Sequence, residues 1–168
     1  MDTRTALYTG GCQCGSIRYS IFAPPAQPLA VCHCRMCQKT LGCPSGVFVA
    51  INLTDFQWKR GSATSFQSSS LARRIFCAQC GTPLAYQSKV RPFIDICLGT
   101  FDHPKQFGKP EVQMGVESCL GEWALVQDVL RLTTDQLIPD TVLSYQHPDK
   151  DTDDVEWQQM SENKSIEK

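Results

Sequence analysis

The chain has 168 residues, of which 16 are basic and 17 acidic, so its formal net charge at pH 7 is −1. This length fits a single domain with one hydrophobic core, and the balanced charge gives no reason to expect binding to nucleic acid or to an anionic membrane. The N-terminal segment lacks the apolar stretch of a secretion signal, and no segment is apolar for long enough to span a bilayer. We therefore expect a cytoplasmic protein whose ten cysteines stay reduced.

The pattern of apolar residues predicts a mainly β domain of short strands with little helix. Alternating apolar and polar residues at 17–21 predict a half-buried strand, and further strands are expected at 46–53, 73–77, 92–101, 112–116 and 122–130. A short helix is expected to begin within the cysteine-rich segment 32–37 and to run towards Leu41. Residues 133–145 could hold another turn or two of helix, broken at Pro139.

The C-terminal residues differ in composition from the rest of the chain. Residues 147–168 carry seven acidic residues against three lysines and few apolar residues. We expect them to form an acidic polar tail or a peripheral helix without a role in function. Residues 1–146 are expected to form a single zinc-binding β domain, for the reasons that follow.

Four cysteines form two short pairs, each followed directly by a glycine: Cys12 and Cys14 before Gly15, and Cys77 and Cys80 before Gly81. Two thiolates this close in sequence can reach the same metal ion, and two such pairs complete a tetrahedral site. A glycine at this place can turn with positive φ at little cost, which lets backbone N–H groups point at sulfur. We interpret the four cysteines as a structural zinc site, with buried apolar cysteines as the alternative.

A denser cluster contains Cys32, Cys34 and Cys37, whose sulfur atoms could face one ion from three sides. Nothing in the sequence compels a fourth protein ligand. The cluster could therefore bind a second zinc ion whose fourth position is taken by a substrate, as in catalytic zinc sites.

Two nearby residues could instead complete the second site. Cys43 lies six positions after the cluster and would give four thiolates, and His33 lies inside the cluster. The more ordinary role for His33 is a hydrogen bond outside the site, because it would point away from its two ligand neighbours. Cys97 is expected in the core, and Cys119 has no assigned partner.

The histidines exclude two common classes of zinc enzyme. No two of them stand four residues apart, and none is followed two residues later by glutamate. The helix-borne metalloprotease motif and the nucleobase deaminase motif are therefore both missing from the sequence.

Four blocks of sequence, at 10–19, 32–42, 73–84 and 98–104, follow the pattern of one zinc protein family in its order and spacing. Over roughly residues 8–125 the chain resembles the glutathione-dependent formaldehyde-activating enzyme family. The resemblance implies an antiparallel β-tent in which Cys12, Cys14, Cys77 and Cys80 hold one zinc ion. It also implies that Cys32, Cys34 and Cys37 hold a second, which agrees with the division made from spacing.

The family's named reaction joins glutathione to formaldehyde as S-hydroxymethylglutathione, which is carbon–sulfur lyase chemistry in reverse. A centre with three thiolates is electron-rich and soft, so a thiol should compete well for its fourth position. We therefore expect a zinc-thiolate enzyme with two zinc ions per chain that acts on glutathione, or a related thiol, and a small aldehyde.

Glutathione carries two carboxylates, so its binding site should offer cationic side chains near the second cluster. The candidates by position in the sequence are Arg35, Lys39, Arg73 and Arg74. The sequence identifies no acid–base residue, and Asp102 and His103 are polar groups worth examining near the second zinc.

Two other functions fit the same cysteines. The chain could be a non-catalytic domain with two structural zinc ions that binds a protein partner, or a metal or thiol sensor with a labile three-cysteine site. The lability of the second metal and the need for Cys43 distinguish these possibilities.

Overall fold

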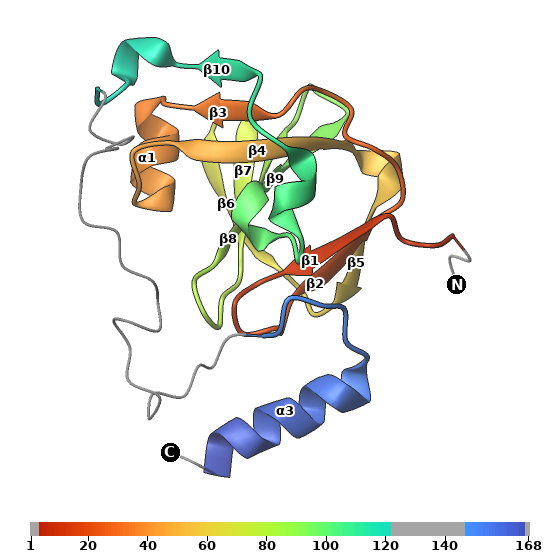
Figure 1. Ribbon diagram of the computed structural model, residues 1–168. Coiled ribbons are helices and arrows are strands. Elements are labelled where there is room, and N and C mark those ends of the chain that lie inside the picture. Colours follow the sequence, from red (N-terminus) through yellow and green to blue (C-terminus); the bar gives the residue numbers. More distant parts are fainter. Residues whose placement is uncertain (1–3, 122–146, 167–168) are drawn as a thin grey trace, which may run out of the picture.

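The computed structural model describes residues 4–121 and 147–166, which form two β-sheets and little helix (Figure 1). The smaller sheet has the strand order β1-β2-β5, with β1 at Tyr8–Gly11, β2 at Arg18–Ile21 and β5 at Phe56–Arg60. The expectation of a mainly β protein is confirmed, and the two sheets fit the expected β-tent.

The larger sheet has seven strands in the order β10-β3-β4-β9-β8-β7-β6. Their bounds are Val112–Met114 (β10), Ala30–Cys32 (β3), Gly46–Asn52 (β4), Phe93–Cys97 (β9), Pro83–Ser88 (β8), Ala72–Phe76 (β7) and Thr64–Ser69 (β6). Neighbouring strands are antiparallel except for the parallel pair β10 and β3.

The described residues also form two α-helices and four short 3₁₀ turns. The helices are α1 (Arg35–Leu41) and α3 (Asp154–Ile166), and the turns are η1 (Leu53–Asp55), η2 (Leu98–Thr100), η3 (Pro104–Phe107) and η4 (Val116–Ser118). The short helix expected after the second cysteine cluster is confirmed by α1. No helix in this part of the chain combines the length and apolar character needed to cross a bilayer.

The register of the seven-stranded sheet gives its two faces different roles. Val49, Ile96, Ala85 and Ile75 stand side by side across β4, β9, β8 and β7, and all four are buried. They pack against Tyr19 and other residues of the smaller sheet to form the main core. Because side chains alternate along a strand, the residues between them point to the opposite face.

That opposite face carries a row of mostly polar and aromatic residues. Ala50, Asp95, Tyr86, Arg74 and Phe66 are neighbours across β4, β9, β8, β7 and β6. A sheet face made of such side chains does not form a simple apolar core, and it is this face that builds the candidate site described below.

A strand is present at the position expected for 17–21, but the expectation that it is half-buried is wrong, because the polar residues of β2 are buried too. Arg18 and Ser20 are each only 2% exposed. Arg18 forms two hydrogen bonds with the buried carboxylate of Asp102, of 2.9 Å from Nη1 to Oδ1 and 2.5 Å from Nη2 to Oδ2. Its Nη2 also donates to the backbone oxygen of Lys150, at 3.2 Å. A buried arginine in this position is tolerated because its Nη1 and Nη2 groups meet acceptors from distant parts of the chain, although its Nε has no hydrogen-bond partner in the described structure.

Residues 147–154 contact the smaller sheet through His147 and Thr152, although most of the segment is exposed. His147 and Thr152 are buried, and Arg60 of β5 donates hydrogen bonds to the backbone oxygens of Thr152 and Asp153. Helix α3 follows directly and lies beyond the smaller sheet (Figure 1). The division of the chain at residue 146 stays a prediction, and the elements expected at 122–130 and 133–145 lie outside the described residues.

Removing the Asp102 carboxylate should destabilise the fold strongly. In the variant Asp102→Ala, Arg18 would remain buried without its counter-ion, so we expect the free energy of unfolding to fall by about 3 to 5 kcal/mol. The matched control is Asp151→Ala, since Asp151 also pairs with Arg18, at 3.5 Å, but is 47% exposed. Its loss should cost less than about 1 kcal/mol. Urea denaturation of both variants measures the difference, and equal losses would contradict this account of Arg18.

Candidate functional site

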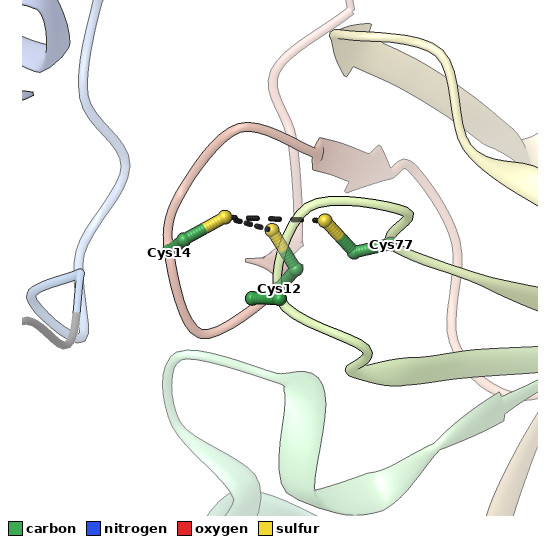
Figure 2. A group of neighbouring side chains, drawn as sticks. Cys12, Cys14 and Cys77 are labelled. Carbon is green, nitrogen blue, oxygen red and sulfur yellow. Dashed lines mark hydrogen bonds between the residues drawn. The ribbon is translucent and has the colours of Figure 1, made fainter.

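Four cysteines from two loops come together at one end of the sheets. Cys12 and Cys14 follow β1, and Cys77 and Cys80 lie in the turn between β7 and β8. Their sulfur atoms all lie within 4.8 Å of one another. Figure 2 shows the side chains of Cys12, Cys14 and Cys77 pointing towards one another from the two loops. We call Cys12, Cys14, Cys77 and Cys80 the four-cysteine group.

The spacing of these sulfur atoms fits a tetrahedral metal. The Sγ atom of Cys14 lies 3.4 Å from that of Cys12 and 3.9 Å from that of Cys77. Two thiolates on one tetrahedral zinc ion stand about 3.8 Å apart, given a Zn–S bond of about 2.3 Å. The group could therefore hold a metal ion.

The glycines after each pair take the backbone conformation that the sequence predicted. Gly15 has φ of 79° and Gly81 of 75°, so the positive φ is confirmed at both. Their N–H groups turn back onto the oxygens of Cys12 and Cys77, at 3.0 and 2.9 Å. Each turn presents two sulfur atoms on the same side of its loop, which is what a shared metal requires.

A serine that the sequence analysis did not consider lies among these sulfurs. The hydroxyl of Ser16 is 3.1 Å from the Sγ of Cys14 and 3.3 Å from that of Cys77. Burial raises the pKa of Cys14 to about 12. At Cys80 burial also raises the pKa, but hydrogen bonds led by that of the Thr82 hydroxyl outweigh it and lower the pKa to about 6. The Thr82 hydroxyl thus favours the thiolate of Cys80, whereas at Cys14 burial outweighs the hydrogen bond from Ser16.

Cys32, Cys34 and Cys37 form a second set, which we call the three-cysteine group. Cys32 ends β3, Cys34 is the N-cap of α1, and Cys37 lies in the first turn of that helix. Their sulfur atoms also lie within 4.8 Å of one another. In the described residues no other cysteine, histidine or acidic side chain belongs to the group.

Neither residue that could complete this group does so. Cys43 is exposed, and its thiol donates to the backbone oxygen of Ser45 at 2.7 Å. The Nε2 atom of His33 lies 3.0 Å from the Gln113 side-chain oxygen. Cys97, expected in the core, packs beneath α1 against the three-cysteine group, and burial raises its pKa to about 12. Cys119 is exposed.

The three-cysteine group is held in place by residues that sequence reasoning missed. The buried amide of Gln38 donates to the backbone oxygens of His33 and Ser118, at 2.7 and 2.8 Å. Gly115 lies so close to Cys34 that an added Cβ would be 2.7 Å from the Cys34 nitrogen. The segment after β10 therefore fixes the start of α1, and with it the positions of the sulfur atoms.

The three-cysteine group opens onto a cavity of about 350 Å³, which we call the thiolate cavity. One wall is apolar and comes mainly from Ala30, Phe48, Val112 and Met114. The other wall is the polar part of the sheet row, with Arg74, Tyr86 and Asp95, together with Arg91 from the turn before β9. Its volume lies in the range of roughly 300 to 1,000 Å³ that small-molecule sites occupy.

Of the four cationic residues chosen from the sequence, the structure brings Arg74 to this cavity. Arg74 is 5% exposed, its Nη2 donates to the Sγ of Cys37 at 3.2 Å, and its Nε has no hydrogen-bond partner in the described structure. Arg35 and Lys39 are exposed, and Arg73 points outward to the side-chain oxygen of Gln87. None of these three lines the thiolate cavity.

Arg91 also lines the thiolate cavity, although it was not among the cationic residues chosen from the sequence. Its Nη2 forms an ion pair of 2.5 Å with the carboxylate of Asp95. Burial raises the pKa of Asp95 above its ordinary value, although the Arg91 guanidinium acts in the opposite direction. The pair thus presents a positive and a negative group next to each other, with the carboxylate incompletely compensated.

Asp102 and His103, the polar groups singled out in the sequence, do not lie at the three-cysteine group. Asp102 is buried in its ion pair with Arg18, and it lines a different cavity, next to Cys12. His103 is exposed, and neither residue lines the thiolate cavity. They follow η2, which places them at the smaller sheet instead.

Residues 7–118 match the sequence model of the family described as glutathione-dependent formaldehyde-activating enzyme. The chain belongs to this family. The match includes every cysteine of the two groups, so the three-cysteine and four-cysteine arrangement lies within the family region.

Two curated relatives are about one third identical to the chain within their aligned segments. A putative glutathione-dependent formaldehyde-activating enzyme of Halomonas elongata is 32% identical over 88 residues, 46% of this chain and 54% of the relative. An uncharacterized lyase of Schizosaccharomyces pombe is 31% identical over 88 residues, 51% of this chain and 63% of the relative. The chain thus spans between half and two thirds of the length of these relatives.

A crystal structure of a Rhodobacter sphaeroides protein has a similar fold. Its TM-score is 0.52 at 20% identity, and the match covers 63% of this chain and 99% of that one. At this identity the likeness concerns the fold alone.

Substituting Gly115 should disturb the three-cysteine group selectively. In Gly115→Ala the new Cβ would collide with Cys34 and displace its sulfur from the three-cysteine group. We therefore expect the purified variant to contain only the metal that the four-cysteine group binds. The matched control is Gly42→Ala, because Gly42 has nearly the same backbone conformation (φ 65°, ψ 26°) as Gly115 (φ 66°, ψ 36°), but an added Cβ there would meet no atom within 4 Å. Elemental analysis of both variants decides, and equal metal contents would show that Gly115 does not position Cys34.

Proposed function

We propose that the protein is a zinc-thiolate enzyme of the carbon–sulfur lyase class that acts on glutathione, or a related thiol, and a small aldehyde such as formaldehyde. The observation that carries this proposal is the three-cysteine group, which opens onto a cavity of about 350 Å³ and has a buried arginine on one of its sulfurs. Family membership supports the same reaction class.

In this proposal the four-cysteine group holds a structural zinc ion, and Cys32, Cys34 and Cys37 hold a second. Zinc bound by three thiolates would accept a substrate thiol as its fourth ligand and keep that thiol deprotonated. Arg74 would offset part of the negative charge that three thiolates gather in one place, through its hydrogen bond to Cys37. The apolar wall of the thiolate cavity would exclude water from the reacting sulfur.

The charged wall of the thiolate cavity suits the ends of glutathione. Its γ-glutamyl end carries an ammonium and a carboxylate on the same carbon, and Asp95 and Arg91 offer the two opposite charges side by side. An ammonium would also compensate the Asp95 carboxylate, which burial disfavours. Arg74, deeper in the cavity, would act at the reacting sulfur rather than at this end.

The proposed reaction is the addition of a thiol to the carbonyl group of an aldehyde. The thiol sulfur forms a bond to the carbonyl carbon, the C=O π bond breaks, and the thiol proton ends on the oxygen. Because thiols add to formaldehyde unaided, the contribution of the protein would be to hold the thiolate and the aldehyde in contact. We also propose a cytoplasmic location, supported by ten cysteines that are all free thiols.

Removing the charge of Arg91 should weaken glutathione binding. In Arg91→Gln a carboxylate of glutathione would lose its charge-assisted hydrogen bond, so we expect the Kd of the zinc-loaded protein to rise by about tenfold or more. The matched control is Lys89→Gln, an exposed residue of the same turn that does not line the thiolate cavity. Isothermal titration calorimetry measures both, and an unchanged Kd in Arg91→Gln would remove Arg91 from the site.

The lability of the metals separates the enzyme from a purely structural protein. We expect two zinc ions per chain, one of which a mild chelator removes quickly, at a rate that glutathione changes. Cys43→Ser should leave both the zinc content and the rates unaltered. Two equally inert zinc ions, with Cys43 required for the second, would instead support a non-catalytic domain that binds a protein partner.

A further inference from the structure

A second cavity, of about 320 Å³, is lined in part by Phe66 and Arg74 of the polar and aromatic row, and we call it the apolar cavity. Thr40 and Leu41 line it at the C-terminal end of α1, whereas Met36 and Cys37 line the thiolate cavity near the N-terminal end of that helix. Its other walls include Phe66, Phe76 and Pro83, with aromatic or aliphatic surface from β6, β7 and β8. Nothing in the proposed reaction with formaldehyde uses this space.

Arg74 borders both cavities, because it is among the residues that line each of them. One of its donors is directed to the Sγ of Cys37, and its Nε lacks a partner among the described residues. No ion pair of Arg74 with a carboxylate is found within residues 4–121 and 147–166, and its guanidinium lies 5.3 Å from the centre of the Tyr86 ring. A buried guanidinium with this few partners has capacity to donate to a ligand oxygen.

The apolar cavity and the incompletely paired Arg74 can both be explained by the shape of the aldehyde that the protein binds. Formaldehyde has no substituent on its carbonyl carbon, so it would leave the apolar cavity unfilled. An aldehyde with an apolar group could place its carbon at the three-cysteine group, its oxygen at Arg74 and its substituent in the apolar cavity. Burial of apolar surface in such a cavity favours binding in proportion to the area covered.

We propose that the electrophile is an aldehyde with a branched alkyl or aromatic substituent, which the apolar cavity binds while Arg74 donates a hydrogen bond to the carbonyl oxygen. This rests on the proposed thiol addition. The product is a hemithioacetal: the sulfur bonds to the carbonyl carbon, the π electrons move to the oxygen beside Arg74, and the thiol proton completes the hydroxyl. Arg74 would stabilise the negative charge that develops on that oxygen.

The test compares two aldehydes with the full-length, zinc-loaded protein. The rate of glutathione addition is measured for 3-methylbutanal and for formaldehyde, and each is divided by the uncatalysed rate in the same buffer. The acceleration should be larger for 3-methylbutanal. Phe66→Ala, which removes one wall of the apolar cavity, and Thr40→Trp, which fills it, should lower the acceleration for 3-methylbutanal by about tenfold and leave that for formaldehyde unaltered.

The matched control is Leu71→Ala, since Leu71 is 56% exposed and Phe66 46%, but Leu71 does not line the cavity. It should change neither rate. A larger acceleration for formaldehyde, or equal losses for both aldehydes in Phe66→Ala, would overturn the inference while leaving the proposed function in place.

A binding measurement keeps the two proposals separate. The unreactive 3-methylbutanamide should bind the wild-type protein and Leu71→Ala, and it should bind Phe66→Ala and Thr40→Trp more weakly, as measured by calorimetry. If neither aldehyde is turned over, the proposed function fails and this titration alone decides the inference. Absence of amide binding to the wild-type protein overturns it.

Discussion

The four-cysteine group is the constraint on which the rest of the structure depends, because it joins the two sheets. Cys12 and Cys14 follow the first strand of the smaller sheet, and Cys77 and Cys80 lie between two strands of the larger one. A metal shared by these sulfurs would fix the sheets at one end while the apolar core packs between them. Each strand of the larger sheet is then committed to one face for the core, and its other face is free to carry polar residues.

Arg74 links the polar face of the larger sheet to the candidate site, because it lies on that face and donates a hydrogen bond to Cys37. A buried cation without a carboxylate partner is unfavourable unless something else compensates it. In this protein the compensation comes from the Cys37 sulfur and the ring of Tyr86, both next to the three-cysteine group. The same side chain borders two cavities, one that contains the three-cysteine group and one that is apolar. In the proposed reaction, metal, thiol and aldehyde would meet beside this buried side chain.

The sequence predicts the features that depend on neighbours along the chain. The two cysteine groups follow from spacing of one to three residues, the turns at Gly15 and Gly81 from the need for positive φ, and α1 from the pattern after Cys34. The mainly β fold follows from short apolar runs between turns. These are local signals, and each refers to a few consecutive residues.

The features that sequence reasoning missed depend on contacts between distant parts of the chain. Arg91 and Asp95 reach the three-cysteine group only through the register of β9 with β8 and β4, which no local pattern gives. Gly115 and Gln38 position the group through the contact between residues 115–118 and the start of α1, although they lie more than 70 residues apart in the sequence. Arg18 was expected at the surface of a half-buried strand, but residues 102 and 150 cover it. A buried polar residue of this kind can be recognised only once its partners are known.

The most direct test of the central claim is a crystal structure of the zinc-loaded protein with glutathione bound. The account predicts two zinc ions, with the sulfur of glutathione at about 2.3 Å from the zinc ion held by Cys32, Cys34 and Cys37. A structure in which the Cys43 sulfur is the fourth ligand and glutathione is bound elsewhere, or not at all, would contradict it.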